Sequence, residues 1–476
     1  MTRTDVHPLP ASAGPSFATL PLAPAQLANL ATLGYAAMTP VQAASLPLAL
    51  AGDDLIVQAQ TGSGKTAAFA LALLSKLKLE GQSQSFAVQA LVLCPTRELA
   101  DQVTTEIRRL ARSDGNVKTL TLCGGVPLRN QTESLKHGAH VVVGTPGRVL
   151  DHLDRGALTL AALNTLVLDE ADRMLDMGFF DDIARIAKLC PKNRQTLLFS
   201  ATYPERIAEL AQQFLRAPKK VKVRSQVDAT QIEQRFYEVK ESERLRAVSL
   251  LLLHFRPAST IAFCNTKQQC RDLADALHSQ GFAALALHGE LEQRERDQVL
   301  VQFANRSCSV LVATDVAARG LDIAQLEAVI NVDTTPDAPL HIHRIGRTGR
   351  AEAKGLALSL ASLDEMGSVG KIELIQGAEV KWYLLAELTP APGGRLLPPM
   401  VTLQIVGGRK EKIRPGDILG ALTGEAGFSA AQVGKINVNE FSTYVAVDRQ
   451  IAKQALERLA AGKVKGKKVK VRLVQE

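Results

Sequence analysis

Eight residues near the N-terminus have the composition of a loop that binds phosphate. Residues 59–66 read AQTGSGKT, between an apolar run at 55–59 that predicts a strand and a helical stretch at 64–78. Backbone N–H groups and the helix N-terminus would hold phosphate oxygens there. Ala59 stands where the common pattern has its first Gly, and the alternative is a chance Gly-rich turn. The residues expected to bind the nucleotide are Thr61, Gly62, Ser63, Gly64, Lys65 and Thr66. Lys65 would reach the β- and γ-phosphates, and Thr66 would ligate Mg²⁺.

A second group lies about 100 residues further along, where TLVLDEAD (165–172) places carboxylates at the end of an apolar run. Beside a phosphate loop, Asp169 would hold Mg²⁺, and Glu170 would orient and deprotonate the attacking water. A lone Asp-Glu pair at a strand end is usually a solvated loop. Together with the phosphate loop, it predicts an ATPase site.

A third group is the arginine-rich segment HRIGRTGR (343–350). The alternative interpretation is a basic face of a helix, but two glycines in the segment would weaken such a helix. We expect Arg347 and Arg350 to act as arginine fingers that reach the γ-phosphate across an interdomain cleft, so that hydrolysis requires closure. The predicted catalytic residues are therefore Lys65, Asp169, Glu170, Arg347 and Arg350.

The elements that must position these groups are strands and helices that alternate along the chain. Short apolar runs alternate with helical stretches such as 97–112, which predicts a parallel sheet covered on both faces. Expected strands in the first half are 55–59, 90–94, 140–144, 165–169 and 195–200. The rhythm restarts with 260–264, 283–288, 309–314, 328–333 and 357–362.

Breaks in this rhythm define the expected domains. The fold class is α/β, with two parallel-sheet domains in tandem and a smaller C-terminal domain. The expected boundaries are a flexible N-terminus at 1–16, a first domain at 17–215, a charged linker at 216–230, a second domain at 231–389, a Pro/Gly linker at 390–400 and a basic domain at 401–476.

Composition excludes several classes of protein. The 476 residues are 46% hydrophobic and 22% charged, which is typical of a globular chain. The sequence has no apolar run of about 18 residues and no signal-like N-terminus, so we expect a cytoplasmic protein without a membrane span. The six cysteines form no CxxC pair, which indicates free thiols in a reducing compartment. In the absence of a heptad repeat, the default expectation is a monomer.

The positive charge is concentrated at one end of the chain. Residues 401–476 hold 14 Lys and Arg against 7 Asp and Glu, a net charge of +7 out of +8 for the whole chain. A basic module attached to a nearly neutral body predicts a nucleic-acid binder. A solubilising tail is the alternative, but the strand and helix patterning of this segment argues against it.

The order of the motifs resembles that of the DEAD-box RNA helicases. The Asp-Glu-Ala-Asp tetrapeptide that gives this family its name is residues 169–172. The resemblance covers about residues 17–362 and implies RecA-like domains. GYAAMTPVQ (34–42) resembles the Q motif, which implies that Gln42 reads the adenine edge and Phe17 stacks on its ring. ATDVAARGLD (313–322) resembles a nucleotide and RNA motif, which implies nucleotide contacts by Asp315 and Gly320.

Further matches to this family concern RNA. PTRELA (95–100), the Gly124–Gly125 pair and TPGR (145–148) resemble RNA-contacting motifs of the first domain. SAT (200–202) resembles the motif that links the nucleotide site to strand separation, and FCNT (263–266) resembles a motif of the second domain. Glycines let backbone N–H groups approach phosphates, and arginines supply charge, so these contacts would not read base identity. The implied RNA-binding residues of the core are Arg97, Gly124, Gly125, Thr145, Arg148, Gln293 and Arg296.

The C-terminal segment has a βαββαβ order, which is that of an RNA-recognition motif. Of the usual stacking positions only Tyr444 is aromatic, so base stacking on the sheet face is doubtful. Residues 407–427 and 433–438 resemble the DbpA-type subgroup, which implies binding to a hairpin of large-subunit ribosomal RNA in a pre-ribosomal particle. Candidate RNA-binding residues are Arg409, Lys410, Lys412 and Arg414, and the Lys463–Lys470 run would face phosphates.

The sequence thus predicts an ATP- and Mg²⁺-dependent RNA helicase that locally unwinds duplexes during assembly of the large ribosomal subunit. Its partners would be duplex and single-stranded RNA. Three alternatives stay open: an ATP-gated RNA clamp with little unwinding, a general RNA-dependent ATPase without ribosomal targeting, and a DNA helicase, which the motif set disfavours.

Overall fold

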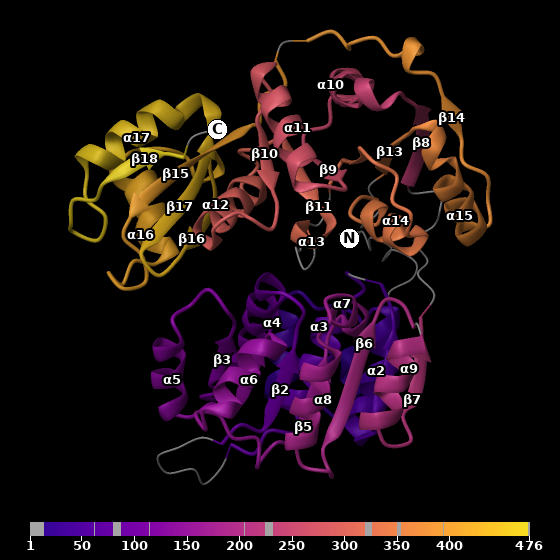
Figure 1. Ribbon diagram of the computed structural model, residues 1–476. Coiled ribbons are helices and arrows are strands. Elements are labelled where there is room, and N and C mark those ends of the chain that lie inside the picture. The colour runs from indigo at the N-terminus through magenta and orange to yellow at the C-terminus, as the bar shows by residue number, and fades with distance from the viewer. Residues whose placement is uncertain are drawn as a thin grey trace, which may run out of the picture. The chain divides into compact units, whose positions relative to one another are not determined.

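The computed structural model describes residues 14–60, 62–79, 87–113, 115–203, 205–223, 232–318, 326–349, 354–393 and 395–474 (Figure 1). These residues divide into two compact units, one at 14–223 and one made of 232–318 and 326–474. In the part of the chain described, none of the helices has both the length and the apolar character to cross a membrane.

A parallel sheet forms the centre of the first unit, and its described part has seven strands in the order β3-β4-β2-β5-β6-β1-β7. Its strands are β1 (Leu55–Gln58), β2 (Ala90–Leu93), β3 (Thr119–Leu122), β4 (Val141–Gly144), β5 (Thr165–Leu168), β6 (Gln195–Ser200) and β7 (Lys219–Lys222). The expected strands are confirmed to within a residue or two at each end. Because β2, β4 and β5 are wholly buried, helices must cover both faces of the sheet.

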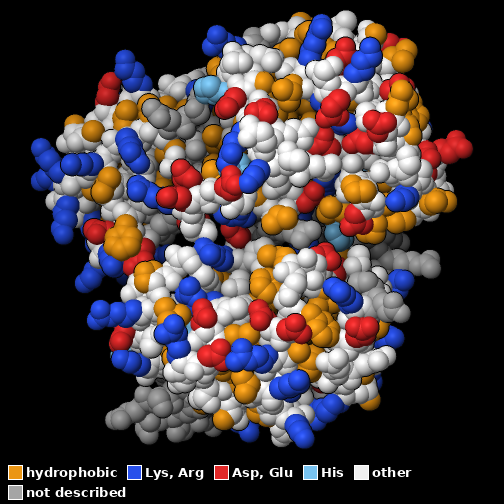
Figure 2. All heavy atoms as spheres, in the orientation of Figure 1, with side chains coloured by type: hydrophobic (Ala, Val, Ile, Leu, Met, Phe, Trp, Pro, Cys, Tyr) orange, Lys and Arg blue, Asp and Glu red, His pale blue; other side chains and the backbone are white. Residues whose placement is uncertain are grey.

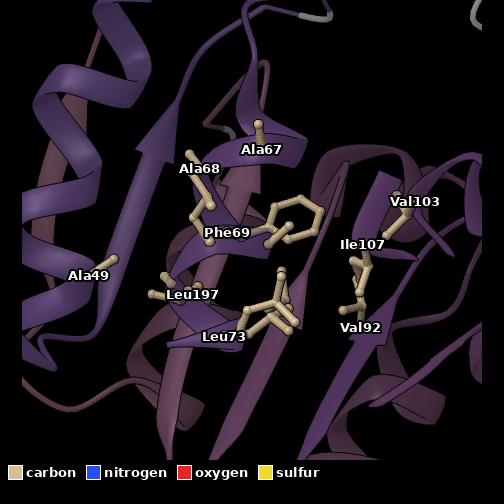
Figure 3. Close-up of a cluster of buried hydrophobic side chains, with 14 of the residues drawn as sticks. Ala49, Ala67, Ala68, Phe69, Leu73, Val92, Val103, Ile107 and Leu197 are labelled. Carbon is tan, nitrogen blue, oxygen red and sulfur yellow. The ribbon is translucent and has the colours of Figure 1, made fainter. Parts of the chain in front are cut away.

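Among the described residues, the helices that accompany this sheet are α1 (Pro24–Thr32), α2 (Pro40–Ala51), α3 (Lys65–Leu74), α4 (Arg97–Leu110), α5 (Leu128–Lys136), α6 (Pro146–Asp154), α7 (Ala171–Asp176), α8 (Phe180–Leu189) and α9 (Glu205–Phe214). One face carries a core in which Phe69 and Leu73 of α3 meet Val103 and Ile107 of α4 and Leu197 of β6 (Figure 3). A separate core under α6, α7, α8 and α9 covers the other face.

Strand β7 lies inside the segment 216–230 that was expected to be a linker. It pairs in parallel with β1 at the edge of the sheet, with Val221 buried and its three lysines exposed. Exposed lysines protect an edge strand from pairing with other chains, and here they gave the strand the composition of a linker. The first domain therefore continues at least to Lys222.

The second unit repeats this architecture with parallel strands in the order β10-β11-β9-β12-β13-β8-β14. The strands are β8 (Ile232–Glu238), β9 (Thr260–Cys264), β10 (Ala284–Leu287), β11 (Val310–Thr314), β12 (Ala328–Asn331), β13 (Gly355–Ala361) and β14 (Trp382–Tyr383). The helices are α10 (Arg244–Phe255), α11 (Lys267–Ser279), α12 (Gln293–Ala304), α13 (Asp315–Ala318), α14 (Ala338–Ile345) and α15 (Met366–Gln376). Two RecA-like parallel-sheet domains are thus confirmed.

The C-terminal domain of this unit has an antiparallel sheet in the order β16-β17-β15-β18. Its elements are β15 (Met400–Val406), α16 (Pro415–Gly420) with a π-helical turn to Glu425, β16 (Val433–Val438), β17 (Ser442–Asp448), α17 (Ala452–Ala461) and β18 (Val471–Leu473). This is the expected βαββαβ order. The segment before it is packed, because Ala391 N donates to Leu253 O at 3.0 Å and Leu396 contacts the core of the second RecA-like domain.

Candidate nucleotide and RNA sites

The phosphate loop connects the end of β1 to the start of α3. Gly62 and Gly64 have φ angles of +81° and +93°, a region that favours glycine. Lys65 is 6% exposed, and its Nζ donates to the Ala59 carbonyl at 2.6 Å, so the ammonium group is held inside the curve of the loop. This arrangement places a fixed positive charge and the N-terminus of α3 together, which suits an anionic phosphate.

The first turn of α2 is anchored to this loop through Gln42. Thr39 and Gln42 form a capping box, and the Gln42 Nε2 donates to Gly64 O at 3.1 Å. Phe17 is buried and packs edge-to-face against Tyr35, with 6.0 Å between ring centroids. Gln42 therefore lies directly against the phosphate loop, whereas the Phe17 ring belongs to the core. Their predicted contacts with adenine stay predictions.

Two acidic residues follow β5 at the same edge of the sheet. Asp169 is 2% exposed, and burial raises the pKa of its carboxyl to about 7, although the nearby Lys65 ammonium opposes that rise in pKa. Glu170 adopts a left-handed conformation at φ 51° and forms a buried ion pair with Arg173 at 3.1 Å. Left-handed backbone at a residue other than glycine costs about 1 kcal/mol or more and is concentrated at functional sites. A carboxylate and a hydroxyl, from Asp169 and Thr66, are the oxygen donors that Mg²⁺ prefers.

The acidic segment is tied to the loop that follows β6. The Asp172 Oδ2 accepts hydrogen bonds from the backbone of Ala201 at 3.1 Å and of Thr202 at 2.8 Å, and from the Thr202 hydroxyl at 2.9 Å. The SAT segment therefore contacts the end of the DEAD segment directly, and its role in linking the nucleotide site to strand separation stays a prediction.

The predicted RNA-binding residues of the first unit lie at the carboxyl ends of the neighbouring strands β2, β3 and β4. The Arg97 guanidinium lies against Gly124, where an added Cβ would be 2.8 Å from it. Arg148 donates to Val126 O at 2.9 Å and to Gln131 Oε1 at 3.0 Å. Thr145 precedes α6 as its N-cap residue, and Gly125 has φ +75°. The structure thus brings these residues together at one edge of the sheet.

In the second unit, a buried arginine organises the equivalent edge. Arg344 is 1% exposed and donates to both oxygens of Asp315, at 2.8 and 2.6 Å, and to Asn265 Oδ1 at 3.1 Å. Arg296 donates to Ala317 O at 2.7 Å, which joins α12 to α13. The Asp315 carboxylate is therefore engaged within the domain, and its contact with nucleotide stays a prediction.

Other predicted residues have simpler placements. Arg347 is 6% exposed and follows α14, and Gln293 begins α12, where its Nε2 donates to Asp297 at 2.8 Å. Thr61, Gly320 and Arg350 lie outside the described residues.

Three residues that position the sites were not among the predicted ones. Arg173 pairs with Glu170, Arg344 holds Asp315, and Gln131 holds Arg148 while its Nε2 donates to Cys123 O at 2.8 Å. Arg173 follows Glu170 at the helical i,i+3 spacing, which is a usable signal. Arg344 and Gln131 carry no such signal, because their partners are distant in the sequence.

Two loops of the C-terminal domain, one after β15 and one before β18, carry a group of basic residues. The hollow between β15, α16 and the turn before β18 has a volume of about 300 Å³ and is lined by Arg409, Lys412, Ile413, Arg414 and Lys465. The Lys465 Nζ donates to Lys412 O at 2.6 Å, which joins the two loops. Figure 2 shows Lys and Arg side chains gathered along the outer edge of this domain, at the left of the view.

Two RecA-like sheets, each with charged residues at the carboxyl ends of its strands and one with a phosphate loop, are typical of an ATPase with tandem domains. Comparison with known proteins makes this specific. Residues 39–210 match the DEAD/DEAH box helicase family, 243–352 the helicase conserved C-terminal domain, and 402–473 the DbpA RNA binding domain. The chain belongs to the DEAD-box ATP-dependent RNA helicases, and it carries a DbpA-type C-terminal domain.

Individual relatives agree with this assignment. The chain is 52% identical to the ATP-dependent RNA helicase DbpA of Escherichia coli over 97% of this chain and 100% of the relative. It is 44% identical to the DEAD-box ATP-dependent RNA helicase CshA of Bacillus cereus over 75% of this chain and 67% of the relative. The structure of S. cerevisiae Dbp5 bound to RNA and ADP BeF3 is similar at a TM-score of 0.70 and 31% identity, over 78% of this chain and 96% of that chain.

Proposed function

We propose that this helicase remodels ribosomal RNA during assembly of the large ribosomal subunit, and that its C-terminal domain binds an RNA hairpin there. The observation that carries the proposal is the basic hollow formed by Arg409, Lys412, Arg414 and Lys465. Four basic residues line one concavity, which suits the closely spaced phosphates of a folded RNA. A role in ribosome assembly would place the protein in the cytoplasm.

The core would use Mg²⁺ with ATP. Thr66 and Asp169 would hold the ion, which neutralises charge on the phosphates when it is bound. Lys65 would bind phosphate oxygens, and Glu170 would orient water and accept its proton. Arg347 and Arg350 would stabilise charge on the γ-phosphate in a closed state that ATP and RNA favour. Arg97, Arg148, Gln293 and Arg296 would hold the RNA backbone without reading its sequence.

Binding by the C-terminal domain would raise the effective concentration of nearby duplex at the core. Separating five stacked steps costs about 7 kcal/mol at roughly 1.4 kcal/mol per step, which one binding event can supply for a short duplex only. We therefore propose local unwinding rather than processive movement.

The test is the steady-state ATPase rate with three RNAs: a ribosomal fragment that contains the hairpin, a scrambled RNA of equal length, and poly(A). The full chain is compared with the R409Q/K412Q/R414Q variant and with a control variant, K188Q/K371Q/K453Q. The control neutralises three exposed lysines that lie on helices α8, α15 and α17 and do not line the basic hollow. We expect stimulation by the fragment to be strong and to be lost only in the first variant. Equal stimulation by all three RNAs would leave a general RNA-dependent ATPase, and no stimulation would favour the RNA clamp.

A further inference from the structure

An exposed aromatic ring lies at the basic end of the C-terminal domain. Among the described residues, only Phe441 and Trp382 are exposed aromatic side chains, and Phe441 is the more exposed at 58%. Phe441 lies in the turn between β16 and β17. The Lys410 Nζ is 4.2 Å from the centre of its ring and 3.4 Å from Glu440. A cation therefore lies beside a ring that is otherwise open to solvent.

The backbone holds this ring and the basic loop together. The Gly407 N–H donates to Phe441 O at 3.0 Å, Arg409 N–H to Asn439 O at 2.8 Å, and Lys410 N–H to Glu440 O at 3.1 Å. A Cβ at Gly408 would lie 2.3 Å from Asn439 O, so glycine permits this close approach. Arg409 and Lys412 of the same loop line the basic hollow. The turn that carries the ring is therefore held against the loop that carries the basic residues proposed to bind phosphate.

The usual stacking surface of this fold is closed. Tyr444, on the sheet face opposite the helices, is 3% exposed, and its hydroxyl accepts a hydrogen bond from Gln404 at 3.0 Å. On the same face, the Thr402 hydroxyl is bonded to Ser307 at 2.5 Å and to Asn305 at 3.2 Å. A base cannot stack on Tyr444 without breaking this packing.

We propose that Phe441 is the stacking platform for an unpaired base of the bound RNA, while Arg409, Lys412 and Arg414 hold the adjoining backbone. This inference rests on the proposed RNA-binding function of the domain. An unpaired base is required because the bases inside a duplex have both faces covered by their neighbours. The Lys410 ammonium, whose long side chain is exposed, would contact a phosphate next to the stacked base.

The first experiment measures affinity of the full chain for two RNAs that share one stem, a hairpin with an unpaired loop and a blunt duplex. We expect F441A to weaken binding of the hairpin by about 5- to 100-fold, the range that loss of one base–aromatic stack produces. Binding of the blunt duplex should change less than twofold. F441W should restore hairpin affinity, whereas F441L should not. The matched control is L473A, which truncates another exposed apolar residue of the same domain, at 43% exposure.

A second measurement reports on stacking directly. Because Trp382 is the chain's one tryptophan, the W382F/F441W variant carries a single tryptophan at position 441. We expect the hairpin to quench its fluorescence and the blunt duplex not to. Unchanged hairpin affinity in F441A, or no quenching in W382F/F441W, would overturn the inference. If R409Q/K412Q/R414Q still weakens binding in that case, the basic RNA-binding site is supported and only the stacking on Phe441 is wrong. If this variant also binds normally, both the proposed site and the proposed stacking are wrong.

Discussion

Asp172 and Thr202 are joined by two hydrogen bonds, one from the Thr202 N–H at 2.8 Å and one from its hydroxyl at 2.9 Å. Asp172 lies three residues after Asp169, and Thr202 lies in the loop after the neighbouring strand β6. Any shift of the acidic segment during the ATP cycle therefore moves the Ala201–Thr202 loop with it.

Removing the Thr202 hydroxyl should separate hydrolysis from unwinding. In Thr202→Val, one charge-assisted bond worth about 1.5–3 kcal/mol is lost, while the backbone bond remains. We expect ATPase activity within about threefold of the parent and unwinding of a short duplex reduced about tenfold or more, because that energy corresponds to at least a factor of ten. Both rates are measured on one preparation. Thr32→Val, at an exposed position in α1, is the control, and equal losses in both rates would contradict the link.

Replacing Gly64 by alanine should abolish tight binding of ATP. An added Cβ would lie 2.6 Å from Gln42 Nε2 and 3.0 Å from Thr39 Oγ1, and the φ of +93° adds backbone strain. Gly52→Ala is a matched control, because its φ is +95° but the nearest atom is the end of the Lys76 side chain at 3.6 Å. Titration with a fluorescent nucleotide should show a loss of more than tenfold for G64A only. A similar loss in both variants would mean that strain alone is responsible.

Glu170 should contribute to the chemical step and not to binding of ATP. Glu170→Gln keeps the shape of the side chain but removes its ability to accept a proton. We expect kcat to fall by about 10²–10⁴, the usual contribution of a general base, with KM for ATP within about threefold. Thermal unfolding of the variant is measured alongside, since the change also breaks the ion pair with Arg173. A higher KM at constant kcat would exclude the assigned role.

Sequence patterns predicted most of the fold because the two parallel sheets of the RecA-like domains are buried on both faces. Strands such as Val141–Gly144 and Val310–Thr314 are continuous apolar runs that few other structures accommodate. The edge strand at Lys219–Lys222 was not predicted. It buries only one residue, and its three exposed lysines give it the charged composition that is typical of a linker. Short motifs that are local in the sequence, such as residues 59–66 and 169–172, indicated the sites directly.

Contacts between distant residues could not be predicted in this way. The hydrogen bonds of Gln131 with Arg148 and of Arg344 with Asn265 depend on which strands become neighbours, and no spacing encodes that order. The position of Phe441 beside Lys410 depends likewise on the loop after β15 lying along the turn after β16.

His341 should make the second RecA-like domain less stable in acid. It is 1% exposed and its ring centre lies 5.8 Å from that of Phe236. Burial, together with the nearby Arg344 cation, lowers the pKa of His341 from 6.5 to about 4. Between these two values the unfolded chain binds a proton that the folded chain does not, so the free energy of unfolding decreases as pH falls through this window. The decrease is at most about 1.4 kcal/mol per pH unit.

Denaturant unfolding between pH 4.5 and 7 should show a shallower pH dependence for His341→Gln than for the parent. His278→Gln, at an exposed position in α11, is the control for replacing a histidine. Identical pH dependence in the parent and His341→Gln would show that the folded domain accepts a proton at position 341 without penalty.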